Sequence, residues 1–512
     1  MEGTSQTQDG NYIMDVHTSS YGAGNFDALI AKLDSNGTVI WAKTIGGTGI
    51  DAGTGRSIQT TDGGYIQGRG YTESYGQGGP SDFWVSKIDS LGNFLWAKTY
   101  HISTDHGWDF YLTHDKGYII GGHSGNAAGS GSWDATVIKI DSIGNVMWAK
   151  SWGGPIGYAT CITSLEQTQD RGYIVCGWWG TGTDTDDIIV TKLDSLGKIM
   201  WIKNYSGASA EHGYGVINTS DGGYIIVGET YSYGAGGQDV LVMKLNSIGD
   251  TVWVRTFGGP LDDWAKSICA TSDGCCIVTG STFSYGAGGY DLLFIKLTST
   301  GNIVWAKTFG GVGDEKVSDV SITLDSGYIV SGRTTSWGEG LNDCLLIKLE
   351  SDGSIGGSCP PLQPCSPNVT FPSLIITTPT PNETSPAVTV ADCTPIVTSP
   401  ILVETNICNP ASVEENKKPS NIFNLFQNCP NPFIGTTEIE YGLPQDAKVN
   451  ISIYNLSGQK VATLVNENKK AGYYTINWDG KDIFGKRYAS GIYFYKLETN
   501  NYTVTKKMYF IR

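Results

Sequence analysis

The stretch "DGGYIIVGETYSYGAGGQDVLVMKLNSIGDTVWVRTFGG" (Asp221–Gly259) is followed by a reworded copy, "DGCCIVTGSTFSYGAGGYDLLFIKLTSTGNIVWAKTFGG" (Asp273–Gly311). The aspartate that opens each copy serves as a marker, and successive markers lie 51 to 55 residues apart. The markers are Asp9, Asp62, Asp115, Asp170, Asp221, Asp273 and Asp325. Seven copies in so constant a register indicate a repeat architecture, in which each unit buries its apolar face against its neighbours.

Each copy predicts four strands. In the copy that opens at Asp221, strands are predicted over 223–231, 239–245 and 250–257, and the first strand of the next copy, 266–272, precedes its marker. A glycine-rich loop separates the second and third strands, and short turns such as "NSIGD" separate the third and fourth. Both suit the positive φ that glycine adopts without cost. The second strand is apolar on both faces, which is typical of a strand between packed sheets.

Seven units of about fifty residues with four antiparallel strands each predict an all-β fold, a seven-bladed β-propeller of four-stranded blades over residues 1–358. A β-solenoid would use a much shorter repeat, and stacked sandwiches would need about a hundred residues per domain. The segment "DALIAKLDSNGTVIWAKTIGG" (Asp27–Gly47) resembles a bacterial β-propeller repeat whose core reads roughly "DAFVxKLDxxGxxxWxxxxGG". That resemblance implies the fold and leaves the ligand open.

The two ends of the repeat region are irregular. A tryptophan marks six of the fourth strands, at Trp41, Trp96, Trp148, Trp201, Trp253 and Trp305, but the seventh copy has only "SDGSIGGSC" there. Met1 falls inside the first strand of the first copy. We expect a gene that starts further upstream and supplies the missing strand, which leaves the first blade truncated here. Strands from the following linker are the alternative.

The composition changes after the repeats. Residues 359–420 are rich in Pro, Thr and Ser and predict an extended linker. Its four cysteines, Cys359, Cys365, Cys393 and Cys408, are the better disulfide candidates, whereas Cys269 and Cys276 either face each other across a hairpin or are small buried residues. Residues 421–512 show alternating apolar residues and regular turns, which predict a small immunoglobulin-like β-sandwich of about seven strands.

Several segments of this last part, "LFQNCPNPF", "IYNLSGQKV", "INWDGKDIFGKRYASGIYFYKL" and "KKMYFIR", resemble the type A C-terminal sorting domain of type IX secretion. The residues that carry the resemblance are Asn431, Pro432, Phe433, Gly458, Trp478, Asp479, Gly480, Gly491, Lys506 and Lys507. Cys429 departs from the pattern. The resemblance implies a Gram-negative bacterium, the type IX machinery as partner, and a location outside the cell or on the outer-membrane surface. A signal peptide is therefore expected, although the sequence after Met1 has none. An immunoglobulin-like binding module is the alternative.

Charge and motifs exclude several functions. The net charge of −16 argues against a nucleic-acid or anionic-membrane partner, and no apolar stretch is long enough for a transmembrane helix. None of the six histidines recurs at an equivalent position through all the repeats, and no metalloprotease or nucleophile-elbow motif occurs. We therefore predict a monomer with no catalytic residue, no metal site and no cofactor, with a bound cation such as calcium as an alternative.

Two residue types recur in every copy. Aspartates open the third strands at Asp27, Asp82, Asp134, Asp187, Asp239, Asp291 and Asp343, and lysines follow at Lys32, Lys87, Lys139, Lys192, Lys244, Lys296 and Lys348. Because active sites break symmetry, both are interpreted as scaffold. We expect the aspartates to accept N–H bonds from the glycine-rich loops, and the lysines to lay their stems on apolar surface with their amines in water.

A further series of acids follows the fourth strands: Asp51, Asp105, Glu211, Asp263 and Glu315, with Tyr158 in place of an acid. These carboxylates either ring the mouth of the central channel and bind a cation or a sugar, or cap their own loops. Trp178 and Trp179, in the most divergent copy, are candidates for stacking on carbohydrate, as are the non-recurring Trp108 and Trp264. The predicted function is an exported, non-catalytic binding or adhesion module for a glycan or surface polymer. The alternatives are a propeller lyase or hydrolase acting on polysaccharide, and a structural surface protein.

Overall fold

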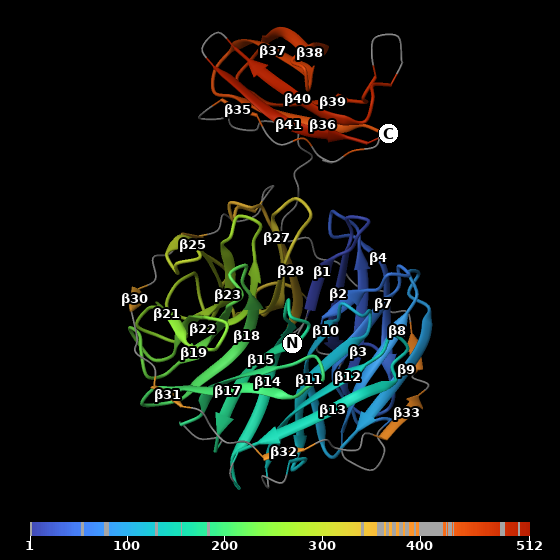
Figure 1. Ribbon diagram of the computed structural model, residues 1–512, viewed down its shortest axis with the longest axis vertical. Coiled ribbons are helices and arrows are strands. Elements are labelled where there is room, and N and C mark those ends of the chain that lie inside the picture. The colour runs from blue at the N-terminus through green and yellow to red at the C-terminus, as the bar shows by residue number, and fades with distance from the viewer. Residues whose placement is uncertain are drawn as a thin grey trace. The chain divides into compact units, whose positions relative to one another are not determined.

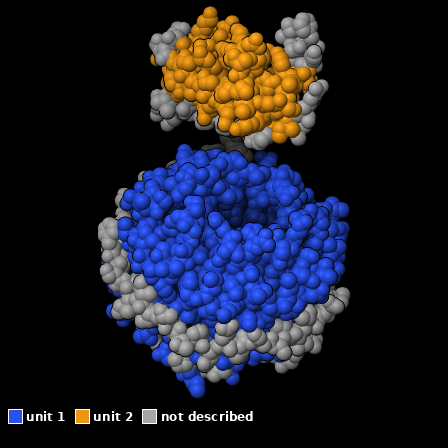
Figure 2. Space-filling model, viewed as in Figure 1, with its two compact units in different colours: residues 1–409 blue, residues 410–512 orange. Residues whose placement is uncertain are grey.

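The computed structural model is all-β. The described residues are 3–52, 56–75, 81–128, 132–154, 156–181, 185–338, 342–355, 363–364, 368–370, 375–377, 382–384, 389–393, 396–398, 423–425, 428, 433, 435–481, 487–499 and 502–511. Within these ranges no helix is long and apolar enough to cross a membrane. The chain divides into two compact units, Met1–Asn409 and Pro410–Arg512 (Figure 2).

The described strands of the first unit form seven sheets, numbered here 1 to 7 in chain order (Figure 1). The first strands are β1 (Gly3–Gln6), β5 (Asp51–Ala52) with β6 (Ser57–Gln59), β10 (Asp105–Leu112), β14 (Ala159–Gln167), β18 (Glu211–Asn218), β22 (Asp263–Ala270) and β26 (Glu315–Ile322). The second strands are β2 (Tyr12–Thr18), β7 (Tyr65–Thr72), β11 (Tyr118–Gly125), β15 (Tyr173–Gly180), β19 (Tyr224–Thr230), β23 (Cys276–Thr282) and β27 (Tyr328–Thr334).

The third strands are β3 (Asp27–Leu33), β8 (Asp82–Ile88), β12 (Trp133–Ile140), β16 (Asp187–Leu193), β20 (Asp239–Leu245), β24 (Asp291–Leu297) and β28 (Asp343–Leu349). The fourth strands are β4 (Val39–Gly46), β9 (Phe94–His101), β13 (Val146–Gly153), β17 (Ile199–Ser206), β21 (Thr251–Gly258) and β25 (Ile303–Phe309). Sheet 7 contains three strands among the described residues. Antiparallel sheets of four strands at this repeat length are consistent with propeller blades.

In sheets 5 and 6 the second and third strands are buried on both faces; for the second strand the sequence predicts this. All seven residues of β19 and all seven of β20 are buried. Their side chains belong to apolar clusters shared with the neighbouring sheets; Ile226, for example, packs in one cluster with Ile174 of sheet 4. The core therefore lies between the sheets.

The recurring tryptophans of the fourth strands link neighbouring sheets. Each packs against the turn glycine between the third and fourth strands of the next sheet; a Cβ on Gly249 would lie 3.0 Å from the Trp201 ring. Trp253 also donates its indole N–H to the carbonyl of Ser299, at 3.1 Å. Because Gly249 has a φ of 81°, glycine serves both the turn and this close approach. The coupled recurrence of tryptophan and glycine is thus a packing requirement.

The amines of the recurring lysines do not lie in water, which corrects the expectation from the sequence. Each lysine amine instead forms an ion pair with the marker aspartate of its own sheet. Lys139 Nζ lies 3.0 Å from Asp115 and Lys244 Nζ lies 2.7 Å from Asp221, and only 3% and 6% of the two lysine side chains are exposed. The hydrogen bond from Lys244 lowers the pKa of Asp221 to about 2. Each pair joins the turn before the second strand to the third strand.

Contacts also join sheet 7 to sheet 1. Ser321 Oγ of β26 donates to the carbonyl of Thr4 in β1 at 2.8 Å, and the Leu324 N–H donates to Gln6 Oε1 at 2.6 Å. Ile329 of β27 packs in one apolar cluster with Tyr12 and other residues of sheet 1. The last repeat is therefore in contact with the first.

Short strands from residues 363–398 add a fifth strand to the outer side of sheets 1 to 6. They are β29 (Gln363–Pro364), β30 (Asn368–Thr370), β31 (Ile375–Thr377), β32 (Asn382–Thr384), β33 (Thr389–Cys393) and β34 (Ile396–Thr398). This part of the predicted linker consequently belongs to the first unit. The side chains of its four candidate disulfide cysteines lie outside the described residues, and Cys269 and Cys276 are free thiols.

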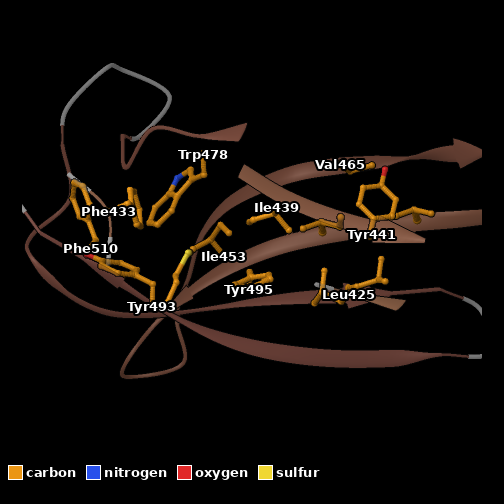
Figure 3. Packing of buried hydrophobic residues seen from close by; sticks show 14 of the residues in the cluster. Leu425, Phe433, Ile439, Tyr441, Ile453, Val465, Trp478, Tyr493, Tyr495 and Phe510 are labelled. Carbon is orange, nitrogen blue, oxygen red and sulfur yellow. The ribbon is translucent and has the colours of Figure 1, made fainter. Parts of the chain in front are cut away.

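The described strands of the second unit form two sheets. One is formed by β35 (Asn424–Leu425), β36 (Thr437–Leu443) and β39 (Gly472–Trp478), and the other by β38 (Lys460–Lys469), β37 (Ala447–Asn455), β40 (Gly491–Glu498) and β41 (Thr503–Phe510). At one end of its core the rings of Phe433, Trp478, Tyr493 and Phe510 pack together (Figure 3). The Phe433 ring centroid lies 4.9 Å from Phe510 and 5.6 Å from Trp478. These seven strands agree with the predicted number.

Candidate functional site

One end of every sheet in the first unit carries the features that the sequence singled out. Second and fourth strands end there, and third strands and the first strands of the next sheet begin there. Four of the third-strand aspartates, Asp27, Asp134, Asp239 and Asp291, accept N–H bonds from the loops that precede them, as predicted. Asp27 Oδ2, for example, accepts from Ala23 at 2.8 Å and from Gly24 at 3.1 Å. We call this end the loop face, defined by the loops before the first and third strands.

The five acids of the predicted channel-mouth series all lie at the loop face and are buried: Asp51, Asp105, Glu211, Asp263 and Glu315. Each is bonded to its own loop. Asp263 accepts the Gly259 N–H at 2.7 Å and the Ser284 hydroxyl at 2.7 Å. Glu211 accepts the Gly207 N–H at 2.6 Å, and burial raises its pKa. In this geometry the carboxylates cap loops; a role in ligand binding stays a prediction.

The second and fourth residues of the first strands differ from sheet to sheet. In sheets 3 and 5 to 7 they are half-buried, whereas the residues between them are buried. They are His106 and Trp108, His212 and Tyr214, Trp264 and Lys266, and Lys316 and Ser318. Here aromatic and cationic side chains break the repeat at the loop face. Figure 2 shows the first unit hollowed near its centre.

Sheets 6 and 7 hold the first aromatic group, here named the Trp264 cluster: Trp264, Phe283, Tyr290 and Lys316. The Tyr290 ring lies 4.7 Å from Trp264 and 5.0 Å from Phe283, between ring centroids. Lys316 Nζ lies 4.5 Å from the Tyr290 centroid. Phe283 is 44% exposed, although it is a large apolar side chain. Exposed rings beside an amine suit a sugar face with hydroxyl or acidic substituents.

Sheets 4 to 6 hold a second group around His212. His212 Nδ1 lies 2.7 Å from Glu229 Oε1, and the Tyr214 hydroxyl donates to the same oxygen at 2.9 Å. Burial lowers the pKa of His212, but the bond to Glu229 and the charges of Glu229 and Asp186 outweigh it and raise that pKa overall. Lys266 Nζ lies 4.0 Å from the Tyr214 centroid.

Trp178 and Trp179, the two tryptophans predicted to stack on carbohydrate, have different neighbours in the structure. Both are half-buried. The Trp178 ring lies 6.0 Å from His212, so Trp178 belongs to the His212 group. Trp179 packs against Tyr158 at 5.6 Å and against the apolar cluster between sheets 3 and 4.

A third group joins sheets 2 and 3. His106 stacks on Tyr71 at 4.4 Å and on His123 at 5.3 Å, and the Trp108 indole donates to His123 Nδ1 at 3.1 Å. Burial lowers the pKa of His123 to about 3. His123 therefore acts as a neutral acceptor. His106, His123 and His212 thus contact aromatic rings. The sequence signal that could have found His106 and His212 is variation at a fixed position after each acid.

Sheet 2 carries a histidine where four other sheets have glycine. His101 ends β9, and its Nδ1 lies 2.6 Å from Asp82 Oδ1 and 3.7 Å from Asp105 Oδ2. Burial raises the pKa of Asp105 to about 6. Among the described residues, these three form the one group of His, Cys, Asp and Glu side chains close enough to share a metal ion.

The residues of the sorting-domain resemblance occupy the second unit, apart from Asn431 and Pro432, which lie outside the described residues. Phe433 and Trp478 are buried in its core, and Gly458 and Gly480 adopt positive φ in turns. Asp479 accepts the Lys481 N–H at 3.1 Å and pairs with the Lys481 amine. The remaining three residues, Gly491, Lys506 and Lys507, lie on β40 and β41. These positions indicate structural roles for several of the residues and leave the sorting role as a prediction.

Comparison with known proteins gives one family match. Residues 432–502 match the model described as the FlgD Ig-like domain, which agrees with the predicted immunoglobulin-like unit. No curated protein sequence matches the chain.

The solved structures that match include two distant likenesses. One is PorZ, described as an essential bacterial surface component of the type-IX secretion system of Porphyromonas gingivalis, with 10% identity over 99% of this chain and 92% of that chain and a TM-score of 0.20. The other is a glycoside hydrolase family 43 arabinoxylan arabinofuranohydrolase from Bacillus subtilis, with 11% identity over 78% of this chain and 94% of that chain and a TM-score of 0.26. Neither likeness is close enough to support an argument about function.

Proposed function

We propose that the chain is an exported, non-catalytic, seven-bladed β-propeller that binds a glycan or surface polymer through its loop face. In this proposal residues 1–358 form the propeller, 359–420 lead to the C-terminal unit and supply outer strands to sheets 1 to 6 on the way, and 421–512 form the sorting domain. The protein acts as a monomer outside the cell or on the outer-membrane surface. The seven sheets and the contacts from sheet 7 to sheet 1 support a closed ring.

One observation carries the binding proposal. The Trp264 cluster places an exposed ring, two half-buried rings and a half-buried amine side by side on a face whose scaffold otherwise repeats. Aromatic faces stack on the apolar faces of sugars, and an amine bonds their oxygen substituents. Packing does not require these residues, because the equivalent positions of the other sheets carry different side chains.

A glycan array tests this proposal. We expect wild type to bind a defined set of polysaccharides, and Trp264→Ala with Lys316→Met to bind them at least tenfold more weakly with an unchanged unfolding midpoint. Trp253→Phe is the matched control, because Trp253 lies on an outer strand and the phenylalanine that replaces it is still aromatic. Absence of binding by folded wild type, or equal binding by the double variant, contradicts the proposal.

The acid series is tested in the same format. In our proposal Asp263 and Glu315 contribute to ligand or calcium binding at the channel mouth as well as capping their loops. Asp263→Asn with Glu315→Gln keeps one acceptor oxygen at each site and removes both charges. Unchanged glycan and calcium binding by this folded variant would restrict the acids to loop capping.

The His212 group favours the enzymatic alternative, a lyase or hydrolase acting on an extracellular polysaccharide. The Tyr214 hydroxyl and the His212 imidazole share a Glu229 oxygen, Asp186 lies 3.6 Å from the imidazole, and the Lys266 amine lies over the Tyr214 ring. General acid–base chemistry uses groups of these kinds. A reducing-sugar assay combined with absorbance of unsaturated products separates the two functions. Turnover that His212→Gln abolishes establishes the enzyme; binding without turnover supports the module. If the protein shows neither binding nor turnover, a structural surface protein is the remaining alternative.

We further propose that the C-terminal unit directs export through the type IX machinery. Support comes from the sequence resemblance and from the immunoglobulin-like match over 432–502. A reporter carrying residues 410–512 behind a signal peptide should reach the medium or cell surface of a type IX-competent bacterium. Retention in the periplasm, with a folded reporter, contradicts the proposal.

A further inference from the structure

The fifth strands follow the first unit in reverse order. β29 pairs with β25, β30 with β21, β31 with β17, β32 with β13, β33 with β9 and β34 with β4, all antiparallel. Figure 1 shows β30, β31, β32 and β33 at the periphery of the unit. The chain thus builds its sheets in one direction and then returns along their outer strands. We call residues 363–398 the belt.

The pairing register is the same at each of five sheets. The first belt residue lies opposite the last residue of the fourth strand, as in the pairs Asn368 with Gly258 and Asn382 with Gly153. The third belt residue lies opposite a buried polar residue, as in Thr370 with Thr256. The belt strands start seven positions apart, at Asn368, Ile375, Asn382, Thr389 and Ile396. One heptapeptide therefore serves one sheet.

The amino-acid sequence of the belt carries the same period. Prolines recur at Pro372, Pro379, Pro386 and Pro400, and threonines at Thr370, Thr377, Thr384 and Thr398. In the sequence, the first three of these prolines fall between paired segments and Pro400 follows the last one, so none of the four occupies a paired position. Seven extended residues span about 23 Å, so each repeat can both pair and cross to the next sheet.

We propose that the outer edges of sheets 1 to 6 are peptide-docking edges that the belt occupies in cis, and that heptapeptide spacing selects the edge for each repeat. Strand addition is held by main-chain bonds, which tolerate many side chains. Uncovered outer edges are templates for pairing with other chains. The belt covers six such edges and ties each sheet to the next. This inference is independent of the proposed ligand.

Two deletions in the full chain test whether the spacing of the belt repeats or the recognition of their side chains selects the edge that each repeat pairs with. Removal of residues 382–388 deletes one whole repeat, so the two later repeats move back by one sheet. We expect β13 and β9 to stay protected from hydrogen exchange, and the amides of β4 to exchange at least tenfold faster. Removal of only residues 385–387 breaks the phase, so both β9 and β4 should lose protection. In both variants β25, β21 and β17 are internal controls, because their belt strands precede the deletion.

The opposite pattern overturns the proposal. If side chains choose the edges, the deletion of 382–388 exposes β13 and leaves β9 and β4 protected. If the belt does not occupy the edges, exchange in all fourth strands is unchanged in both variants. A local variant tests the pairing without a deletion that could prevent folding. Ile375→Pro with Ile376→Pro should speed hydrogen exchange in β17 alone. Thr378→Pro, which lies between two paired segments, is its control and should leave exchange unchanged. Association of the deletion variants in light scattering would identify a second copy as the substitute occupant.

Discussion

Arg56 and Asp319 lie 263 positions apart in the sequence and form a two-point ion pair. Arg56 Nε lies 3.2 Å from Asp319 Oδ2, and Nη2 lies 3.0 Å from Oδ1. Arg56 follows the start of sheet 2 and Asp319 belongs to sheet 7, so the ion pair joins the second repeat directly to the last. Ser267 of sheet 6 also donates to Asp319 Oδ1, at 2.8 Å.

Breaking this ion pair should destabilise the first unit. Asp319→Asn leaves the Arg56 charge without its partner, and we expect a loss of about 2–3 kcal/mol in the free energy of unfolding. Arg56→Met combined with Asp319→Leu should recover part of that loss, since neither charge then needs a partner. Urea unfolding of Arg56→Met, Asp319→Leu and the double variant measures the coupling. Additive effects would show that the two residues do not interact.

The lysine–marker pairs should matter in proportion to the burial of the lysine. Lys139 is 3% exposed and Lys348 is 27% exposed, although both make the same contact in their own sheets. Asp115→Asn strands a buried amine and should cost about 2 kcal/mol of unfolding free energy. Asp325→Asn is the matched control, expected to cost about 1 kcal/mol or less. Equal losses would argue against desolvation as the cause.

His123 should make the first unit sensitive to mild acid. Its folded pKa is lowered to about 3, so the unfolded chain takes up a proton below about pH 6.5 while the folded protein does not. Stability should consequently fall as the pH drops from 6.5 towards 4, by about 1.4 kcal/mol per unit from this group at most. His123→Gln keeps an acceptor for Trp108 and removes the titration. The difference between wild type and variant should therefore change with pH; a constant difference contradicts the assignment.

The glycine that ends a fourth strand should resist substitution. A Cβ on Gly258 would lie 1.8 Å from Asp239 Oδ1, the carboxylate that bonds the glycine-rich loop. Gly258→Ala should cost about 2–3 kcal/mol of unfolding free energy, because buried strand residues have to move. Gly125→Ala is the control, since its nearest neighbour would be an ordinary 3.5 Å away. Similar unfolding midpoints for the two variants would contradict this explanation.

Much of the scaffold could be predicted from the sequence because each structural requirement recurs. Trp201 and Gly249 repeat together because one packs on the other. Asp27 recurs because its loop needs an acceptor. The contact of Lys244 with Asp221 was missed, because it depends on how the marker turn folds back over the third strand.

The candidate site was harder to predict. Trp264, Tyr290 and Lys316 come from three separate segments, and no sequence spacing brings them together. The sequence signal for this site is that two positions in each copy do not repeat. Averaging over the copies hides this variation. The belt has the reverse difficulty: its period is visible in Pro372 and Pro379, but the edges it pairs with follow only from the structure.

The belt also constrains how such a gene can lengthen. A duplication that adds one fifty-residue unit adds an outer edge, and a distant insertion of seven codons has to accompany it if that edge is to be covered. The number of fifty-residue units and the number of heptapeptide repeats should therefore change together among genes that descend from this one.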